Sequence, residues 1–333
     1  MTYGKQKMNP KISVIMSAYN SEAYIAEAIE SILNQTVKDF EFIIFEDGST
    51  DNTKKIVQRY SKKDKRIIPV YNKRNVGYVG FIRNLNRGLN LAKGKYIARM
   101  DSDDISLQQR FKIQYNYLEK NRDIFLIGSR AININPWGKI LGITRNTTGI
   151  EKIKEKLEEE NCIIHPSIMF RNEKILKYRE KALYCEDYDA YLQLLLLKKN
   201  IENLNFPLIK YRLHDNTTGV LNNLHQKLFA EKIREFYLLE KNSGKDIYDE
   251  FNPEDISRIK IKKDSRKLFI EIYIQTLFKL NKMDLTREKC LNYFYTYGFL
   301  NKMVFYYIIS FFPVKSLEFI RKIVWKNQND KIK

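Results

Sequence analysis

The chain has 333 residues, of which 44 % are hydrophobic and 13 % aromatic, and this apolar content excludes a disordered or collagen-like protein. Lys and Arg number 59 against 40 Asp and Glu, so the net charge is +19 and we expect an anionic partner: nucleic acid, an anionic membrane or a phosphorylated substrate. Three widely spaced cysteines fit neither a disulfide framework nor a zinc site. Since the N-terminal apolar run is too short for a signal core and no run has the length of a spanning helix, we expect a cytoplasmic protein.

The first hundred residues alternate strand and helix patterns. Short β-branched runs predict strands over residues 12–16, 42–45, 67–70 and 96–100. Apolar residues at helical spacing predict helices between them: one over 25–33 capped by Ser21, one after the turn at 46–53, and one near 79–92. This alternation predicts an α/β protein with a mostly parallel, twisted sheet and helices on both faces.

The rest of the chain becomes progressively more helical. We expect helices over 107–119, 151–160 and 186–199, and an extended segment over 163–170. Beyond residue 221 the pattern is helical throughout. The sequence therefore predicts two domains, an α/β domain over residues 1–220 and a helical region over residues 221–333.

Polar clusters follow three of the predicted strands, where ligands of parallel sheets bind. They are Ser17 to Asn20, Glu46 to Ser49, and Asp101 to Asp104. In the last cluster, Asp101 and Asp103 have the i, i+2 spacing and the oxygen ligands that suit Mg²⁺ or Mn²⁺. A solvated acidic loop, or a helix start with Asp104 near the dipole, explains the same residues, and the spacing alone leaves both interpretations open.

Seven motifs carry a resemblance to a known family. In chain order they are "ISVIMSAYNSEAYIAEAIESILNQT", "FEFIIFEDGSTDNT", "NVGY", "LNRGLNLAKGKYIARMDSDDI", "HPSIMF", "CEDYDAYLQL" and "YRLHDN". Over about residues 10–218 the chain resembles the bacterial family 2 glycosyltransferases of GT-A fold, especially those that build lipooligosaccharide and capsular chains. The resemblance implies a Rossmann-like GT-A sheet, to which this chain adds its C-terminal helical region.

The resemblance implies a nucleotide-sugar site. It assigns Ala18, Tyr19, Asn20 and Asp47 to the base and ribose, and a carboxylate that accepts from an imide N–H favours uracil. Glu46 stands where relatives often carry Asp, and Ser49 or Thr50 can also act as a helix cap. The resemblance further places Asn75 and Arg83 near the phosphates, although a surface arginine is an equal alternative for Arg83, and assigns Asp101 with Ser102 to the donor.

The resemblance also implies a metal site and a catalytic base. The metal ligands are Asp103, Asp101 and His214, and His214 fits Mn²⁺ better than Mg²⁺. Asp187 is the base that takes the acceptor proton in an inverting transfer, and Glu186 orients it or touches the acceptor. The resemblance places His165 on the acceptor side, and a capped strand start explains this residue equally well. We expect Asp189 to be an acidic residue that interacts with the dipole at a helix start.

The C-terminal segment combines aromatic residues with basic charge. Residues 301–333 hold seven Lys or Arg and two acids, and amphipathic helices over 301–326 suit a membrane interface. A helix that packs on the catalytic domain or on another subunit is the alternative. We expect a protein peripheral to the inner face of the cytoplasmic membrane.

These patterns together predict an inverting, metal-dependent hexosyltransferase. It would move a hexose or N-acetylhexosamine from a UDP-sugar, with Mn²⁺ or Mg²⁺, to a sugar hydroxyl of a glycan or glycolipid acceptor such as lipooligosaccharide or capsule. One alternative is a family member that uses another nucleotide donor or has lost catalysis. A basic nucleic-acid-binding protein would explain the charge but not the acidic clusters, so no nucleic-acid partner is expected.

Overall fold

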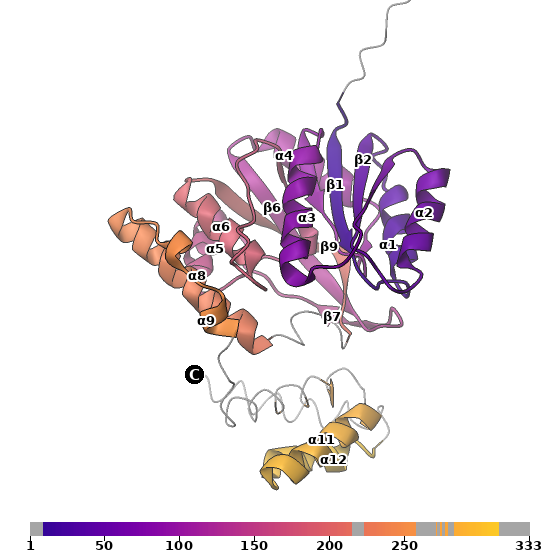
Figure 1. The fold of residues 1–333 in the computed structure, drawn as a ribbon, viewed down its shortest axis with the longest axis vertical. Coiled ribbons are helices and arrows are strands. Elements are labelled where there is room, and N and C mark those ends of the chain that lie inside the picture. The colour runs from indigo at the N-terminus through magenta and orange to yellow at the C-terminus, as the bar shows by residue number, and fades with distance from the viewer. Residues whose placement is uncertain are drawn as a thin grey trace, which may run out of the picture. The chain divides into compact units, whose positions relative to one another are not determined.

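The computed structural model describes residues 9–214, 223–257, 271, 274, 277–278 and 283–312. The chain folds into two compact units, Met1–Ser257 and Arg258–Lys333 (Figure 1). The first unit extends past the domain boundary expected near residue 221. Each unit is described by itself.

The first four strands form a parallel sheet, as predicted. They are β1 (Ile12–Ala18), β2 (Phe40–Glu46), β3 (Ile67–Tyr71) and β4 (Tyr96–Arg99), in the spatial order β3-β2-β1-β4. The connecting helices are α1 (Ile25–Leu33), α2 (Thr53–Lys63) and α3 (Gly77–Leu91). Strand order reverses between β1 and β4, so this is the point at which a ligand crevice is expected.

The second half of the sheet is mixed. Its strands are β5 (Ile105–Ser106), β6 (Ile124–Ile134), β7 (Ile140–Ile143), β8 (Met169–Arg171) and β9 (Asn200–Arg212). β8 lies between β4 and β6 and is antiparallel to both. β9 runs parallel to β6. β5 pairs antiparallel with β9, and β7 pairs antiparallel with β6. The α/β class is confirmed, although the run of parallel neighbours β3-β2-β1-β4 ends where β8 pairs antiparallel with β4. The extended segment expected over 163–170 is wrong in part, because Pro166 lies in a short 3-10 helix, η1 (His165–Ser167), before β8.

The sheet separates two hydrophobic clusters, because successive strand side chains point to opposite faces. Val14 and Met16 of β1 pack with α1, α2 and the helix α4 (Arg110–Lys120), whereas Ile15 packs on the opposite face with α3. That second face also buries α5 (Ile150–Leu157) and α6 (Glu186–Leu196). Both helices were predicted, and α6 carries the Glu186–Asp187 pair in its first turn.

Three further helical segments complete the first unit. They are α8 (Asn223–Ser243), which packs on α6 through Phe229 and Ile233, followed by η2 (Tyr248–Glu250) and α9 (Glu254–Ser257). In the second unit, α11 (Met283–Tyr297) and α12 (Asn301–Ile309) share a small cluster that includes Tyr293 and Met303.

The C-terminal segment is described only in part. The first expected interfacial stretch coincides with α12, whereas residues 313–326 lie outside the described residues. Among the helices that the structure describes, none combines the length and the apolar composition needed to cross a bilayer.

Candidate functional site

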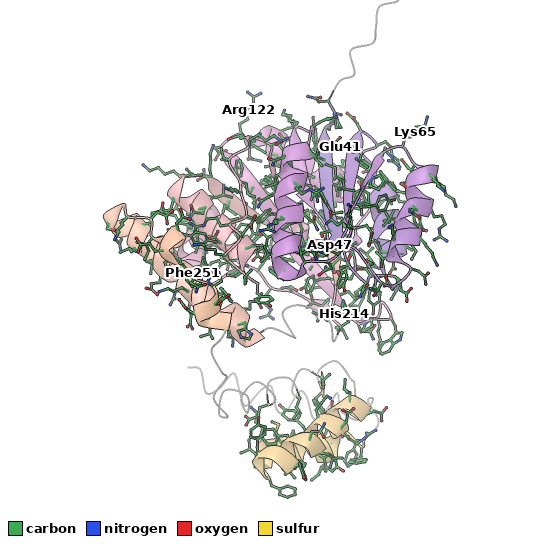
Figure 2. The ribbon with its side chains drawn as sticks, in the orientation of Figure 1. Glu41, Asp47, Lys65, Arg122, His214 and Phe251 are labelled. Carbon is green, nitrogen blue, oxygen red and sulfur yellow. The ribbon has the colours of Figure 1, made fainter. Side chains whose placement is uncertain are left out.

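The turn after β2 buries Asp47 beside β1. The Asp47 amide donates to the carbonyl oxygen of Ala18 at 2.9 Å, which joins the two strand ends. The carboxylate accepts from the side-chain amides of Asn72, at 2.6 Å, and Asn75, at 2.8 Å. The structure thus brings together three of the predicted donor residues, Ala18, Asp47 and Asn75, and adds Asn72. Figure 2 labels the position of Asp47.

Gly48 makes this turn possible. Its φ of +70° lies in the left-handed region that glycine favours. A Cβ at this position would lie 2.6 Å from the backbone carbonyl carbon of Arg74. Because the 74–75 backbone passes so close, Asn75 can reach Asp47.

The loops after β1 and β2 are bonded to each other. The Asn20 amide donates to Ser49 Oγ at 3.1 Å, and Asn20 Oδ1 accepts from the Thr50 amide at 2.9 Å. Neither Ser49 nor Thr50 therefore caps α2, and that alternative is wrong. Tyr19 stands on the same loop with its ring exposed.

The first turn of α1 is not capped by the Ser21 hydroxyl. The Ser21 carbonyl accepts from the amides of Tyr24 and Ile25, while its hydroxyl lies 2.7 Å from Ser102 Oγ. Ser21 and Ser102 thus link the loop after β1 to the loop after β4. The expected cap role is wrong, because the side chain is used between loops.

Arg83 and Arg87 lie one helical turn apart on α3 and do different things. Arg83, the residue expected near the phosphates, forms an exposed ion pair with Glu180 at 2.9 Å. Arg87 instead donates to Asn72 Oδ1 at 2.8 Å, so it supports the amide that holds Asp47.

Three carboxylates gather after β4. Asp101, Asp103 and Asp104 each place one oxygen within 4.8 Å of the others. Burial raises the pKa of Asp104 well above its usual value, and the charges of Asp103 and Asp101 add to this effect. Asp104 Oδ1 accepts from the Arg212 amide at 2.8 Å, whereas its other oxygen is buried without a hydrogen-bond partner in the structure. Asp104 therefore does not begin a helix, and the cap interpretation is wrong.

Basic side chains from distant elements hold this cluster. Arg99, buried at the end of β4, forms an ion pair with Asp101. Arg212, at the end of β9, donates from Nε to the Asp103 carbonyl at 2.7 Å. His214 Nε2 lies 2.7 Å from Asp103 Oδ2, and its ring packs 5.3 Å from that of Tyr24. The structure thus brings together all three predicted metal ligands, Asp101, Asp103 and His214.

This donor set fits a divalent metal. Carboxylate oxygens with one imidazole suit Mn²⁺, and Mg²⁺ accepts the carboxylates alone. One oxygen of Asp104 is buried beside these ligands without a hydrogen-bond partner in the structure. In a chain of net charge +19, such a concentration of acids is the local exception.

Glu186 is buried at the first turn of α6. Tyr78 on α3 donates its hydroxyl to Glu186 Oε2 at 2.8 Å, and His165 Nδ1 lies 3.9 Å from Oε1. Burial, together with the neighbouring Asp187 charge, raises the pKa of Glu186 to about 8. Burial and the Arg99 charge lower the pKa of His165 well below its usual value, so its imidazole is neutral at pH 7 and bonds the Tyr178 hydroxyl at 2.9 Å.

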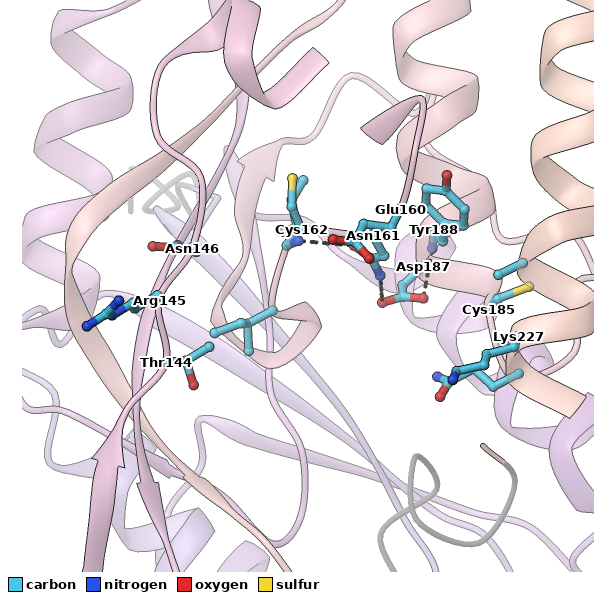
Figure 3. Close-up of a pocket in the computed structure, with 14 residues that line it drawn as sticks. Thr144, Arg145, Asn146, Glu160, Asn161, Cys162, Cys185, Asp187, Tyr188 and Lys227 are labelled. Carbon is cyan, nitrogen blue, oxygen red and sulfur yellow. Dashed lines mark hydrogen bonds between the residues drawn. The ribbon is translucent and has the colours of Figure 1, made fainter. Parts of the chain in front are cut away.

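Asp187 faces the open side of the same helix start. Its carboxylate accepts from Asn161 Nδ2 at 2.9 Å and from the Tyr188 amide at 2.7 Å (Figure 3). Burial raises the pKa of Asp187, which makes the carboxylate a better proton acceptor. Asp187 lines a pocket, and neither Glu186 nor His165 is among the residues that line it.

That pocket has a volume of about 440 Å³ and opens beside α6 and α8. A volume of this size is within the range of small-ligand sites. Its walls come from the segment after β7, the loop before η1, and the first turns of α6 and α8. The lining residues that carry polar side chains include Thr144, Asn146, Asn161, Asp187 and Gln226.

Asp189 has a structural role. It is fully buried and pairs with Arg179, whose guanidinium lies 3.7 Å from the centre of the Tyr248 ring. The expected interaction of Asp189 with the helix dipole is therefore only part of its role, because the Asp189–Arg179 pair also connects α6 to η2.

Sequence reasoning missed Tyr78, Arg99, Asn161 and Arg212. Tyr78, Asn161 and Arg212 each donate a hydrogen bond to a motif residue more than 25 positions away. Arg99 instead forms an ion pair with the nearby Asp101. Asn72 carried a usable signal, because it directly follows β3 as the other polar clusters follow β1, β2 and β4.

The comparisons with known proteins agree with this geometry. The profile of Glycosyl transferase family 2 matches residues 13–185, which span β1 to the start of α6. An uncharacterized glycosyltransferase of Methanocaldococcus jannaschii is 38 % identical over 226 residues, covering 66 % of this chain and 77 % of the relative. The O-antigen biosynthesis glycosyltransferase WbnJ of Escherichia coli is 35 % identical over 233 residues, covering 68 % and 88 %.

Solved structures share the fold at low identity. S. aureus TarS in complex with UDP-GlcNAc superposes with a TM-score of 0.53 at 18 % identity, covering 90 % of each chain. The mannosyltransferase PcManGT of Pyrobaculum calidifontis, in complex with GDP-Man and Mn²⁺, has a TM-score of 0.52 at 14 % identity, covering 68 % of this chain and 65 % of that one. The matched profile and relatives identify this chain as a member of glycosyl transferase family 2, a glycosyltransferase, and the solved structures agree with its α/β GT-A fold.

Proposed function

We propose that this protein is an inverting, metal-dependent glycosyltransferase that moves a hexose or N-acetylhexosamine from a UDP-sugar to a sugar hydroxyl of a growing cell-surface glycan. One observation carries the proposal. Asp101, Asp103 and Asp104 gather within 4.8 Å beside the strand-order reversal, with His214 on Asp103. This is the arrangement that a metal-bound diphosphate needs.

The donor nucleotide would bind between the loops after β1 and β2. Tyr19 offers an exposed ring for the base, and Asp47 offers a carboxylate that can accept from an imide N–H. Asn72 and Asn75 hold that carboxylate in place. Asn20 and Ser102 would complete the ribose side. The UDP-GlcNAc bound by TarS supports a uridine donor.

Asp103 and His214 would hold the metal directly, with Asp101 beside them. When bound, a divalent ion would offset the charge that develops on the departing diphosphate. The Mn²⁺ in the mannosyltransferase complex supports this assignment. Arg99 and Arg212 keep the acidic loop in place by binding Asp101 and the Asp103 backbone.

Asp187 would act as the general base. It would take the proton of an acceptor hydroxyl in the pocket as that oxygen attacks the anomeric carbon, and the bond from this carbon to the diphosphate would break with its electron pair leaving on the phosphate. Attack opposite the leaving group inverts the anomeric configuration. Tyr78 holds Glu186 through a hydrogen bond, and through it the first turn of α6 that carries Asp187.

The acceptor and the place of action are proposed from similarity and composition. WbnJ acts in O-antigen biosynthesis, which supports a cell-surface glycan or glycolipid as acceptor. The basic, aromatic segment 301–326 would attach the protein to the inner face of the cytoplasmic membrane. We expect the full chain to float with liposomes more strongly than a chain that ends before Asn301, and equal flotation of both would remove this C-terminal anchor.

A donor screen tests the nucleotide and the metal. Thermal shift and nucleotide release are measured with UDP-, GDP- and dTDP-sugars, each with Mn²⁺, with Mg²⁺ and with chelator. We expect the UDP-sugars alone to give turnover, and chelator to abolish it. Turnover with a GDP-sugar alone would overturn the donor assignment, and turnover unchanged by chelator would overturn the metal.

Asp187→Asn tests the base. Loss of a carboxylate base lowers kcat by roughly 10²–10⁴-fold, while the thermal shift caused by UDP stays unchanged because Asp187 lies outside the donor loops. Asp123→Asn, which removes an exposed acid near the start of β6, is the matched control and keeps full activity. Full turnover of Asp187→Asn would remove the assignment.

A further inference from the structure

The hairpin between β6 and β7 presents a tryptophan on a rigid turn. The Gly138 amide donates to the Asn135 carbonyl at 2.9 Å, and Gly138 has a φ of +81°. Asn135 Oδ1 also accepts from the amides of Trp137, at 3.0 Å, and Lys139, at 2.9 Å. The turn is thus fixed by its own hydrogen bonds, and the indole of Trp137 is 78 % exposed at its tip.

Strand β7 carries two more exposed apolar side chains. Ile140 is 60 % exposed and Ile143 is 55 % exposed. They pair with Ile134 and Ile132 of β6, and a bulge between these pairs brings Ile140 and Ile143 to one face although they lie three residues apart. One hairpin therefore shows three large apolar side chains to solvent, which is unusual for a surface without a partner.

The hairpin is attached to the candidate metal site. Arg212 Nη1 donates to the Pro136 carbonyl at 2.9 Å while its Nε holds the Asp103 carbonyl. The Leu213 amide also bonds the Ile134 carbonyl at 2.9 Å. In the shared view of Figures 1 and 2, β7 and His214 both lie at the lower edge of the sheet. Whatever binds the hairpin is therefore held next to the reaction centre.

The charge around the hairpin selects an anionic partner. Residues 131–150 contain Lys139, Arg145 and no Asp or Glu. The carboxylate of Glu27 forms an ion pair with Arg212 at 2.5 Å, so the charge of Glu27 is compensated by this arginine. Tryptophan prefers the boundary between acyl chains and headgroups, and nearby cations favour anionic headgroups.

We propose that the hairpin 135–145 is a membrane-contact element, which inserts Trp137, Ile140 and Ile143 into the interface of an anionic bilayer. A stacking platform for a saccharide fits less well, because two of the three side chains are aliphatic and carry no ring. This contact is separate from the C-terminal segment and depends on neither the donor nor the metal. It brings the catalytic edge of the sheet to the membrane surface, where a lipid-linked acceptor is held.

The chain has two tryptophans, Trp137 and Trp325, so each segment can be monitored by itself. In Trp325→Phe, the full-length protein reports on Trp137 alone, and in Trp137→Phe it reports on Trp325 alone. Both are mixed with vesicles of acyl-brominated phosphatidylcholine and phosphatidylglycerol in equal amounts. We expect Trp137 emission to shift to shorter wavelength and to be quenched by the bromine. Unchanged Trp137 emission would overturn the proposal even if Trp325 is quenched.

Charge variants test the partner's chemistry. Vesicle affinity is expected to fall roughly fivefold for Lys139→Gln and again for Arg145→Gln, since each cation near an anionic surface contributes about 1 kcal/mol. Arg122→Gln removes the same charge from the exposed end of β6 opposite the hairpin and is expected to have no effect. An equal loss in Arg122→Gln would show a response to net charge and would overturn the assignment.

Two other occupants of the hairpin give different results. Quenching by vesicles of brominated phosphatidylcholine without the anionic lipid, at equal affinity, would overturn the anionic selection. Emission changes with soluble saccharides or with protein concentration, but not with vesicles, would identify a sugar platform or a second copy and overturn the membrane contact. A failed donor screen would leave these measurements valid, because they need no turnover.

Discussion

Replacing Glu186 by Gln is expected to stabilise the protein, and the gain should grow with pH. In the folded protein burial raises the pKa of Glu186 to about 8, against 4.5 for an ordinary glutamate. Between those two values the unfolded chain has lost this proton while the folded protein keeps it, so the wild type loses stability as pH rises. Gln carries no such proton, keeps the shape of the side chain, and can still accept from Tyr78.

The magnitude follows from the linkage between proton binding and stability. Each pH unit in this window changes the free energy of unfolding by about 1.4 kcal/mol, so from about pH 5 to about pH 7 the difference between Glu186→Gln and the wild type should grow by about 2–3 kcal/mol. It should level off above about pH 8, where both states of the wild type are ionised.

Urea unfolding at a series of pH values measures this difference. Glu180→Gln is the matched control, because Glu180 is an exposed glutamate a few residues away and its variant should differ from the wild type by a constant amount. A difference that is independent of pH in Glu186→Gln, or one that falls as pH rises, would refute the reasoning about the buried carboxyl.

Three further variants test the turn, the buried ion pair and the metal ligand. Gly48→Ala should lower the free energy of unfolding by about 2 kcal/mol and weaken UDP binding, because the residue has positive φ and its Cβ would strike the 74–75 backbone; calorimetry that finds wild-type values for both would contradict this. Asp189→Asn should destabilise the fold by about 2–4 kcal/mol because it leaves Arg179 partly buried with only its longer contact to Asp246, at 3.7 Å; urea unfolding measures it, and kcat per folded molecule should stay near wild type. His214→Gln should raise the Mn²⁺ concentration for half-maximal activity about tenfold while UDP binding without metal is retained; an unchanged Mn²⁺ titration would exclude His214 as a ligand.

The sequence predicted the parts of the fold that depend on local patterns. The strands β1 to β4 and the helices α1, α3 and α6 appear in the periodicity of their apolar residues, because each buries one repeating face. The polar clusters at 46–49 and 101–104 mark strand ends, so their shared edge followed from the parallel order alone. The long strands β6 and β9 escaped prediction, because a strand buried in a mixed sheet has no regular alternation to detect.

The tertiary structure decided which side chains form hydrogen bonds and ion pairs with the motif residues. Asp104 and Arg212 are 108 positions apart in the sequence, and so are Tyr78 and Glu186. No local sequence pattern reveals either contact. Each pair meets only because the fold places β9 beside β5 and α6 beside α3. The tertiary structure also gives Arg83 and Arg87 different partners, although the two look equivalent in the sequence. In the same way, it places Asp187 but not Glu186 in the wall of the pocket. The excess of 19 positive charges indicated an anionic partner. Only the fold shows that Arg99 and Arg212 hold the acids at the carboxyl edge of the sheet, because residue spacing sets the face of an element and the topology sets which faces meet.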